Sequence, residues 1–508
     1  MIGRTNSASI IGIDAELIHI EVDTLSSQLP GLTIVGLPDK SVQEAKERII
    51  SAVKNSGFSW PRKKIVVNLA PADIPKTGTV YDLPIALAIL ASSDQVSYDW
   101  KQFLFVGELA LDGTLRSING ALSAALTCKE RGISNVILPC LNAPEAGIVR
   151  EVAVYGAVSL SEIVEHLNGN RRIPPTVTTQ EIFSQKEKDS LIDFGHIKGQ
   201  ESVKRAIVIA ASGGHNILLS GSPGSGKTMI SRAVPSILPD LTFDESLELT
   251  KIYSVANKLG VNEAIITKRP FRSPHHTAST VSVVGGGRLP RPGELSLAHH
   301  GILFLDEFPE FPSATIEALR QPLEEKKVII SRVSGTVVLP ANFMLVAAMN
   351  PCKCGWLGDP ERECICTPPI IDKYKKKISG PILDRIDLQI HVQRVSLKDL
   401  ATNNKDSHAS NSERYSSMVQ KCRDIQNMRY KEIKVYSNAE VPQKYLDVFC
   451  PLETDAKAFL LHAADRLKLS ARSFYRLIKV GRTIADLEEH ETITKIHISE
   501  ALQYRINE

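Results

Sequence analysis

Residues 215–234 read HNILLSGSPGSGKTMISRAV, in which an apolar, strand-like stretch precedes a glycine-rich loop and the start of a helix. The loop runs from Gly221 to Thr228 and matches the pattern G-x-x-x-x-G-K-[ST] in the strand–loop–helix context of a phosphate-binding loop. Its glycines let backbone N–H groups turn toward phosphate oxygens, and the N-terminal end of the helix favours negative charge. The stretch therefore predicts an α/β core built around a nucleotide site.

The residues of this loop predict a site for ATP and Mg²⁺. We expect Lys227 to reach the β- and γ-phosphates and the Thr228 hydroxyl to bind Mg²⁺. A chance glycine-rich loop is the alternative, and the flanking strand and helix argue strongly against it. The remaining residues should surround the phosphates with their backbone: Gly221, Ser222, Pro223, Gly224, Ser225 and Gly226.

Two further apolar strands are predicted to end in polar side chains. Residues 301–305 lead into Asp306 and Glu307, and residues 343–349 lead into Asn350. The carboxyl ends of parallel strands meet at the ligand edge of a sheet. We therefore expect Asp306 to hold Mg²⁺ through water, and Glu307 to orient and deprotonate the attacking water. Asn350 would position that water, although Asn-Pro is also a turn signal.

Length and composition are those of an ordinary globular protein. The 508 residues suggest two to four domains, with 43% hydrophobic and 23% charged residues. A net charge of +3 neither indicates nor excludes nucleic-acid binding. The N-terminal residues do not resemble a signal peptide, and the apolar run near 83–91 is predicted to be a buried helix. The eight cysteines are expected to be reduced thiols or metal ligands in a cytoplasmic protein without a membrane partner.

Composition divides the chain into regions. Residues 1–169 alternate strands with helices, and a polar, proline-bearing stretch at 170–190 predicts an exposed linker. Residues 191–394 hold the nucleotide motifs. Residues 395–508 open with a polar connector at 400–414 and are otherwise helical. We expect an α/β domain, an ATPase core and a helical lid.

Six long motifs carry a family resemblance. They are RPFRSPHHTAS (269–279), GELSLAHHGILFLDE (293–307), LVAAMNPCKCGWLGDP (345–360), CTPPIIDKY (366–374), ISGPILDRIDL (378–388) and ARSFYRLIKVGRTIADLE (471–488). Over essentially the whole chain they resemble the ComM/YifB family of magnesium-chelatase-like AAA+ proteins. The resemblance implies a hexameric ATPase with a hairpin before sensor 1, related to magnesium chelatase and minichromosome-maintenance helicases. The family's namesake is a DNA branch-migration helicase of natural transformation, so DNA and recombinase machinery are the implied partners.

The resemblance also gives each nucleotide-site residue a role. Lys227-Thr228 and Asp306-Glu307 are similar to the Walker A and Walker B pairs. Asn350 is similar to sensor 1, Arg385 to the arginine finger supplied to a neighbouring subunit, and Arg472 to sensor 2. A guanidinium at the γ-phosphate stabilises the charge of the transition state. Whether Arg472 acts on its own subunit or on the neighbour is open.

Residues 1–169 resemble the Lon-protease fold, of the ribosomal protein S5 domain 2 type. The segments 66–86 and 111–126 are similar to those that carry the catalytic serine and lysine of Lon. Here the corresponding neighbourhoods read Val80-Tyr81-Asp82 and Gly120-Ala121-Leu122, and they contain neither nucleophile nor base. We expect no peptidase activity, and a domain that acts as a scaffold or as a collar contacting DNA.

Cysteines follow the third strand end closely. Four thiolates complete a tetrahedral set for structural Zn²⁺. The C-x-C spacing is tighter than the usual C-x-x-C, and free thiols are the alternative. The histidine pairs 275–276 and 299–300 lack carboxylates at ligand spacing, so we expect them to shape loops. The candidate zinc ligands are Cys352, Cys354, Cys364 and Cys366.

Two insertions carry the candidate DNA contacts. The loop 269–291 and the hairpin at 332–335 would project into a central pore in this AAA+ branch. Basic side chains there would follow the phosphate backbone, and Phe271 would stack on a base. The basic run at 373–377 is better explained as a solvated face. The candidates are Phe271, Arg272, Arg288, Arg291, Lys326, Lys327 and Arg332.

Three functions compete at this point. A DNA translocase or branch-migration helicase is the leading hypothesis. A chelatase-type motor that remodels a metal-inserting enzyme is the second, and the long N-terminal domain and the C-x-C pairs argue against it. A protein unfoldase or Lon-like protease is the third, weakened by the missing serine and lysine. All three predict ATP hydrolysis.

Overall fold

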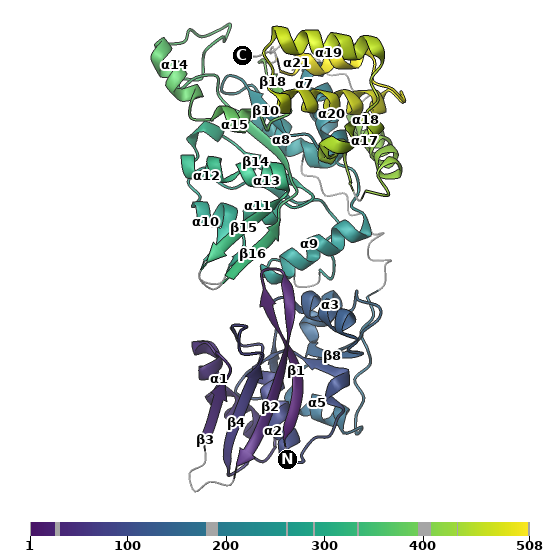
Figure 1. Ribbon diagram of the computed structural model, residues 1–508. Coiled ribbons are helices and arrows are strands. Elements are labelled where there is room, and N and C mark those ends of the chain that lie inside the picture. The colour runs from purple at the N-terminus through teal and green to yellow at the C-terminus, as the bar shows by residue number, and fades with distance from the viewer. Residues whose placement is uncertain are drawn as a thin grey trace.

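The computed structural model of the chain describes residues 2–25, 31–178, 192–260, 263–287, 290–332, 335–394, 408–433 and 435–505. Figure 1 shows an elongated molecule with an α/β domain at one end, the P-loop core in the middle and helices at the other end. This is the predicted architecture of a Lon-protease-like domain, an AAA+ core and a helical lid. Within these ranges, every helix is too short or too polar to cross a bilayer.

Five parallel strands form the central sheet of the core, in the order β11-β14-β17-β10-β18. They are β10 (Ile217–Ser220), β11 (Phe271–Arg272), β14 (Ile302–Leu305), β17 (Met344–Met349) and β18 (Leu388–His391). β14 and β17 are buried along their whole length, which explains their uninterrupted apolar sequences. Because the strands are parallel, β10, β14 and β17 end at one edge, where the P-loop, Asp306 and Asn350 follow.

Helices cover this sheet, and two antiparallel hairpins are inserted in the sequence between its strands. The helices are α7 (Glu201–Gly213), α8 (Lys227–Ala233), α9 (Phe243–Val255), α10 (Thr280–Val284), α11 (Glu294–Leu297), α12 (Ser313–Ala318), α13 (Arg320–Glu325), α14 (Pro368–Lys375) and α15 (Gly380–Leu383). The hairpins pair β12 (Gly285–Gly286) with β13 (Arg291–Pro292), and β15 (Lys327–Arg332) with β16 (Gly335–Pro340). The hairpin predicted around 332–335 is therefore present, with Arg332 at its tip.

Two main sheets and a buried helix build the N-terminal domain. One sheet has the order β1-β2-β4-β3 and the other β5-β8-β9. α2 is buried on nearly all sides, as predicted for the apolar run near 83–91. The strands are β1 (Gly3–Ile11), β2 (Asp14–Leu25), β3 (Gly31–Val35), β4 (Lys64–Ala70), β5 (Phe103–Phe105), β6 (Glu108–Leu109), β7 (Leu115–Arg116), β8 (Asn135–Pro139) and β9 (Ala153–Ala157). The helices are α1 (Lys40–Asn55), α2 (Asp82–Ser92), α3 (Ala121–Arg131), α4 (Ala143–Ala146) and α5 (Leu160–Leu167).

The stretch 170–190, predicted to be an exposed linker, is in part ordered against this domain. Ile173 is buried in the domain's core, and the Thr176 N–H donates to Val154 O at 2.7 Å. The polar composition hid this single buried side chain and the pairing with β9. The rest of the stretch, 179–190, lies outside the described residues.

The C-terminal region is helical, as predicted. Its helices are α17 (His408–Arg429), α18 (Leu446–Phe449), α19 (Thr454–Arg466), α20 (Ala471–Leu487) and α21 (Lys495–Gln503). The stretch 400–414, predicted to be a solvated connector, is already helical from His408. Packing explains this difference, since the Tyr415 ring of α17 meets Phe194 edge-on at 5.2 Å. Tertiary contacts of this kind override a weak local preference.

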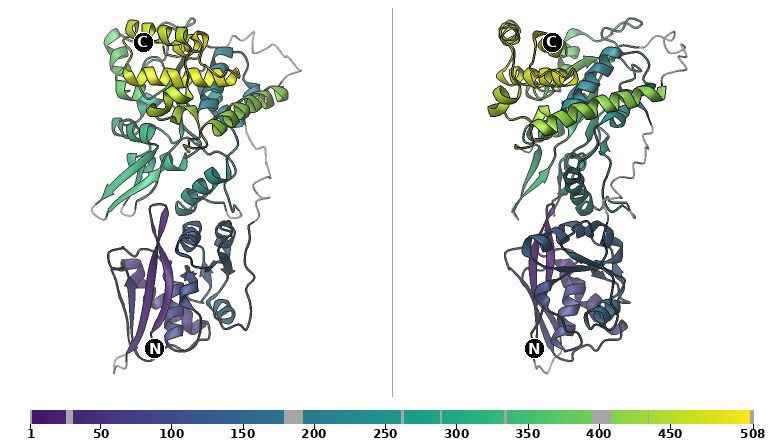
Figure 2. Two further views of the ribbon diagram at one scale, coloured as in Figure 1. Left: turned by 45° about the vertical axis from the view of Figure 1, so that its right-hand side comes forward. Right: turned by 90° about the vertical axis from the view of Figure 1, so that its right-hand side faces the viewer.

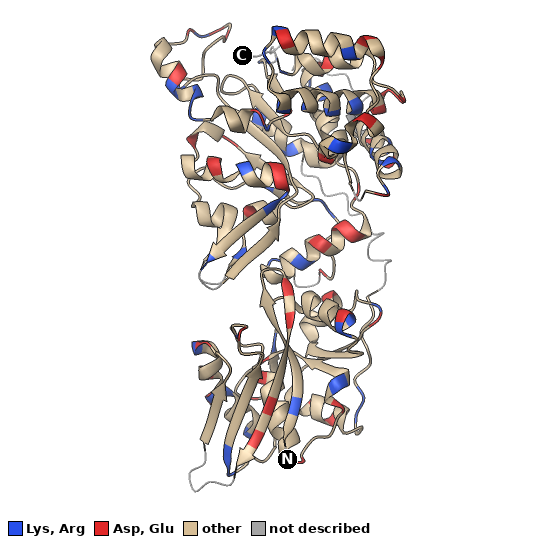
Figure 3. Cartoon of the chain, in the orientation of Figure 1, with Lys and Arg blue, Asp and Glu red and all other residues tan. Residues whose placement is uncertain are grey.

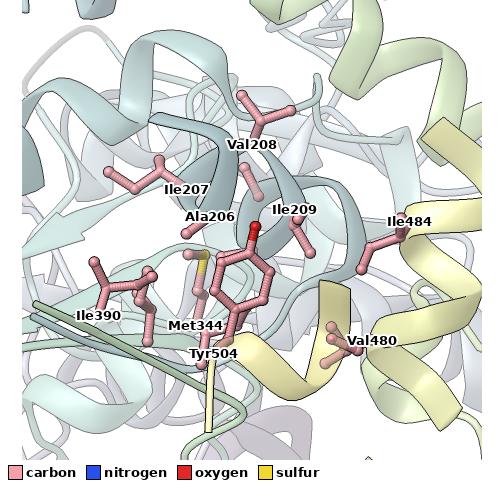
Figure 4. Close-up of a cluster of buried hydrophobic side chains, with 14 of the residues drawn as sticks. Ala206, Ile207, Val208, Ile209, Met344, Ile390, Val480, Ile484 and Tyr504 are labelled. Atoms are coloured by element: carbon pink, nitrogen blue, oxygen red, sulfur yellow. The ribbon is translucent and has the colours of Figure 1, made fainter. Parts of the chain in front are cut away.

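Lid and core share one hydrophobic cluster. Figure 4 shows side chains of α7, such as Ile207 and Ile209, meeting Ile390 of the sheet and Val480 and Ile484 of α20. These side chains are almost completely buried, and each contributes about 1.5–3 kcal/mol by leaving water. The cluster fixes α20 against the sheet and thereby places its N-terminal end.

The tip of the β1–β2 hairpin joins the N-terminal domain to the core. Figures 1 and 2 show this tip near α9 and the β15–β16 hairpin. Ile13 is buried in the same cluster as Leu339 of β16, and a Cβ on Gly12 would lie 2.6 Å from Val337 Cγ1. The N-terminal domain therefore packs directly on a hairpin that the sequence assigned to DNA contact.

Candidate active site

Lys227 is held by neutral oxygens at the phosphate-binding loop. Its Nζ donates to Gly221 O at 2.6 Å, to Ser222 O at 2.9 Å and to Asn350 Oδ1 at 3.3 Å. Burial lowers the pKa of this ammonium group to about 8, and the charge of Asp306 only partly opposes the effect. A buried cation surrounded by neutral acceptors is suited to receive an anion such as a phosphate.

The loop itself has the backbone that its glycines predict. Gly224 and Gly226 adopt φ angles of 78° and 92°, in the region that glycine populates freely. The Gln200 side chain, just before α7, donates to Ser225 O at 3.1 Å and to Gln393 O at 3.0 Å. The role of Gln200 could not be predicted from a sequence motif, because the residues that it contacts lie far away in the sequence.

Thr228 and Asp306 come together as predicted for two Mg²⁺ ligands. The Thr228 hydroxyl donates to Asp306 Oδ2 at 2.7 Å, and the Glu307 N–H donates to Asp306 Oδ1 at 2.9 Å. The start of α8 delivers the first residue and the end of β14 the second. Hydroxyl and carboxylate oxygens are ligands that Mg²⁺ prefers, so this donor set fits that ion.

Glu307 is strained and has a histidine partner. Its φ of 50° lies in the left-handed region, which costs a non-glycine residue about 1–3 kcal/mol. Its carboxylate is 55% exposed, and Oε2 lies 3.1 Å from His276 Nδ1. His276 lies in the loop after β11, and its sequence context predicts only a loop-shaping role. The contact joins separate segments, so no local pattern indicates it.

Arg385 and Arg472 lie at the amino ends of the sheet strands, opposite the edge formed by the carboxyl ends, where the phosphate-binding loop lies. Arg385 precedes the N-terminal end of β18, and its carbonyl accepts from Asn216 Nδ2 at 3.0 Å, just before β10 begins. β10 has four residues, which at about 3.3 Å per residue separate the two edges by about 13 Å. Arg472 reaches the same place from the N-terminal end of α20.

One carboxylate holds both guanidinium groups at this edge. Glu324 Oε1 accepts from Arg472 Nη2 at 2.7 Å, and Glu324 Oε2 accepts from Arg385 Nη2. Partial burial would raise the pKa of Glu324, but the two arginines lower it overall. Arg476 of α20 donates to Arg385 O at 2.7 Å, so the lid fixes this cluster from its other side.

The four cysteines of the C-x-C pairs converge on one point. Sγ–Sγ distances are 3.4 Å for Cys352–Cys354 and 3.6 Å for both Cys352–Cys364 and Cys354–Cys364, and Cys366 completes a set within 4.8 Å. A tetrahedron with metal–sulfur bonds of about 2.3 Å has edges of about 3.8 Å. Hydrogen bonds, that from the backbone N–H of Trp356 first, lower the pKa of Cys354, whereas burial and the neighbouring thiols raise the pKa of Cys364. The thiol set fits a closed zinc site.

Two candidate DNA contacts on β11 are corrected by the structure. Phe271 belongs to the core sheet, is half-buried and stacks on Phe304 at a centroid distance of 5.8 Å, which opposes the expected stacking on a base. Arg272 donates to the two Glu294 carboxylate oxygens at 2.6 and 2.8 Å. This half-buried pair occupies the guanidinium that was expected to contact phosphate.

The remaining DNA candidates differ in exposure. Lys326 is half-buried and lines a cavity at the base of the β15–β16 hairpin, where burial lowers its pKa, so it suits a surface contact less well. Lys327 forms a surface ion pair at 3.6 Å. Arg291 and Arg332 are exposed and fit the expectation best. Arg288 lies outside the described residues.

The second histidine pair does have a carboxylate nearby, which its sequence spacing did not reveal. Glu248 of α9 lies 3.1 Å from His299 Nε2 and 2.9 Å from His300 Nε2. His299 Nδ1 accepts the Asn342 N–H at 3.0 Å, so the Nε2 atom carries the proton and donates to Glu248. This hydrogen bonding uses both ring nitrogens and supports the expected loop-shaping role.

Comparisons with known families cover each part of the chain. Residues 193–400 match the family described as magnesium chelatase, subunit ChlI, and residues 20–142 match subunit ChlI of Mg-chelatase. Residues 409–505 match magnesium chelatase, subunit ChlI C-terminal. The magnesium-chelatase 67 kDa subunit of Chlorobaculum parvum is 27% identical over 165 residues, 32% of this chain and 24% of that protein.

Several relatives match over nearly the full length. The competence protein ComM of Haemophilus influenzae is 42% identical over 503 residues, 98% of this chain and 96% of that protein. The protein YifB of Salmonella typhimurium is 41% identical over 502 residues, with the same two coverages. The chain therefore belongs to the ComM/YifB family of magnesium-chelatase-like AAA+ ATPases.

Proposed function

We propose that the chain is the subunit of a hexameric motor that uses ATP hydrolysis to move branched DNA, as in the recombination intermediates of natural transformation. The observation that supports this most is the meeting of the two hairpins. A Cβ on Gly286 of β12 would lie 3.6 Å from Arg332 Nη2 at the tip of the β15–β16 hairpin. Figure 3 shows basic residues at this end of the core. Exposed guanidinium groups on adjacent tips, Arg332 and Arg291, suit a phosphate backbone.

In this proposal the nucleotide replaces the neutral partners of Lys227. The ammonium group leaves its carbonyl acceptors for phosphate oxygens, while Thr228 and Asp306 hold the Mg²⁺. The bound Mg²⁺ neutralises charge on the phosphates. Glu307 takes the proton of the attacking water, and Asn350 orients that water. Both residues follow the carboxyl ends of neighbouring strands, β14 and β17.

His276 joins this set as a positioning residue for Glu307. The 3.1 Å contact between Nδ1 and Oε2 holds the carboxylate in one orientation. His276 belongs to the segment that continues into α10 and β12. A shift of that insertion would therefore move the partner of the general base.

The two arginines at the far edge support a ring. Arg385 and Arg472 are separated from their own phosphate-binding loop by the sheet, so we assign both to the nucleotide of a neighbouring subunit.

We assign residues 191–394 to the motor and 395–508 to its lid. We assign residues 1–169 to a scaffold or collar, since the neighbourhoods Val80-Tyr81-Asp82 and Gly120-Ala121-Leu122 contain neither the serine nor the lysine of a dyad.

We also assign one structural Zn²⁺ to the four cysteines. Four thiolates close the coordination sphere of the ion, which leaves no position for a substrate. The sulfur–sulfur distances of the four cysteines support this assignment.

The decisive experiment compares ATP hydrolysis and junction movement. The purified chain is mixed with a synthetic four-way junction, linear duplex or no DNA, with and without ATP. We expect ATP-dependent conversion of the junction, hydrolysis stimulated severalfold by junction DNA, and binding that weakens steeply with salt. Glu307→Gln should bind ATP and junction but convert nothing, because it keeps the phosphate contacts and loses the base.

Two results would separate this function from its rivals. Arg332→Ala should slow junction conversion at least about tenfold and change basal hydrolysis less than about twofold, because it lies away from the nucleotide. Hydrolysis without DNA stimulation, and no conversion at low salt, would instead favour a chelatase-like or protein-remodelling motor.

A further inference from the structure

The cysteine loop, residues 351–367, lies directly against the phosphate-binding loop. A Cβ on Gly355 would lie 2.7 Å from two ring atoms of Pro223, and Gly355 has a φ of 86°. Only glycine fits that combination of close approach and conformation. The loop also starts next to Asn350, whose Oδ1 accepts from Lys227. The two loops therefore meet both at Pro223 and beside the lysine.

Arg394 connects the same two loops from another direction. Its Nη2 donates to Pro223 O at 3.2 Å, and its Nη1 donates to Glu361 Oε2 at 2.7 Å. Its guanidinium lies 5.2 Å from the ring centroid of Trp356, and that of Arg362 lies 4.6 Å from the same ring. These cation–π contacts add to the ion pair. Arg394 thus holds the backbone of Pro223 against side chains of the cysteine loop.

Asp359 makes a third contact between the loops. Its side chain is fully buried and accepts the backbone N–H groups of Glu361 and Arg362 at 3.0 and 3.1 Å. The Ser222 hydroxyl lies beside this carboxylate and is the main cause that lowers its pKa. Ser222 is also a carbonyl partner of Lys227. The cysteine loop therefore reaches the residues that surround the phosphate position.

The shape of the cysteine loop depends on its thiols. Residues 351–367 consist of turns and bends without helix or strand. A segment of this kind gains most of its order from a metal that joins its ends, since ligand binding and folding are then coupled. Removing the metal would release the loop, and with it the contacts at Gly355, Asp359 and Arg394.

We infer that zinc at the four cysteines braces the phosphate-binding loop, so that tight ATP binding by this chain requires the metal-loaded cysteine loop. The inference rests on the ATPase function and the zinc site proposed above. It makes the zinc a determinant of nucleotide affinity, although the ion does not touch the nucleotide.

The test measures metal content and nucleotide affinity on the full chain. The chain is purified under reducing conditions, and zinc is determined by elemental analysis. The Kd of a fluorescent, non-hydrolysable ATP analogue is measured in magnesium buffer before chelation, after chelation and after zinc is returned. We expect about one zinc per chain and a Kd that rises at least about tenfold without zinc and recovers with it. Circular dichroism confirms that the zinc-free chain is folded.

Two variants test the inference even if chelation unfolds the chain. Arg394→Gln retains all four ligands, so we expect full zinc content, severalfold weaker binding and a smaller response to chelation. Cys140→Ser removes an exposed cysteine of the N-terminal domain and should change neither quantity.

The possible failures are distinguishable. A folded zinc-free chain with the original Kd, or Arg394→Gln with the original Kd, would overturn the brace. A chain that holds no zinc would overturn the site itself. Failure of the zinc-loaded chain to bind the analogue would instead overturn the proposed ATPase function.

Discussion

At the scale of single residues, Lys227 shows how the nucleotide-free protein carries an unfavourable charge. Lys227 is only 8% exposed, the acceptors of its ammonium group are neutral, and burial lowers its pKa to about 8 from 10.5. A depressed lysine pKa means that the folded state disfavours the charge. The arrangement costs stability without ligand and favours an anion when one arrives.

Lys227→Met should therefore stabilise the nucleotide-free chain while abolishing ATP binding. Between pH 8 and 10.5 the unfolded chain binds more protons at this lysine than the folded chain does, so wild-type stability rises with pH there. Below pH 8 the wild type carries the full cost, on the order of 3 kcal/mol. Thermal unfolding without nucleotide at pH 7 and pH 10 measures the difference. The advantage of the variant should be largest at pH 7, and an equal advantage at both values would contradict the assignment.

Local motifs predicted only those site residues that follow strand ends. The pairs Lys227-Thr228 and Asp306-Glu307 each follow a strand of the parallel sheet. Because the carboxyl ends of parallel strands lie at one edge, the two pairs come together there. The His276 contact with Glu307 joins segments that no motif connects. Arg272 was assigned to DNA because its neutralising partner, Glu294, is invisible without the fold. A charged residue's partner is a tertiary property.

At the scale of elements, the β1–β2 hairpin couples the N-terminal domain to the β15–β16 hairpin. Ile13 lies buried at its tip, and the Gly120 N–H of the same domain donates to Ser254 Oγ of α9 at 3.1 Å. If β15–β16 contacts DNA, any movement of that hairpin changes the packing around Ile13.

Ile13→Gln should loosen this contact and leave the nucleotide site unchanged. Burying an unpaired amide in place of a packed isoleucine costs about 2–4 kcal/mol. We expect the amides of 327–332 and 335–340 to exchange hydrogen at least about tenfold faster, while the affinity for ATP stays the same. Ile11→Gln is the matched control, since Ile11 is 38% exposed at the end of β1, one position before the turn. Unchanged exchange in the Ile13 variant would mean that the domains are not coupled here.

The elements of the core were easier to predict than the segments between them. β14 and β17 are buried on both faces, and burial leaves a continuous apolar run in the sequence. By contrast, one buried residue, Ile173, orders part of an otherwise polar stretch, and the half-buried Tyr415 anchors α17 seven residues after its start at His408. One apolar side chain hardly changes the composition of a polar stretch, so the sequence does not predict that the stretch is ordered.

At the scale of the whole molecule, the proposed function gives one copy halves of two different sites. The phosphate-binding loop, Asp306 and Glu307 stand at one edge of the sheet, while Arg385 and Arg472 share Glu324 at the other edge. A second copy placed edge to edge would complete one of these sites, and a closed ring would complete all of them, which is how a head-to-tail interface generates a ring. Because one carboxylate holds both arginines, they are expected to act together on the same neighbour.

Mixing two inactive variants tests that shared assignment. Arg385→Ala and Arg472→Ala should each assemble and hydrolyse ATP slowly, because each lacks one of two guanidiniums. In a mixture with Lys227→Ala, either arginine variant should regain up to about a quarter of wild-type turnover, since that fraction of random interfaces combines an intact loop with intact arginines. Mixing Arg385→Ala with Arg472→Ala should restore nothing, because no subunit then offers both arginines to its neighbour. If Arg472 acted on its own subunit, that mixture would also recover about a quarter. The turnover of this last mixture, measured at equal total protein, therefore decides between the two placements of Arg472.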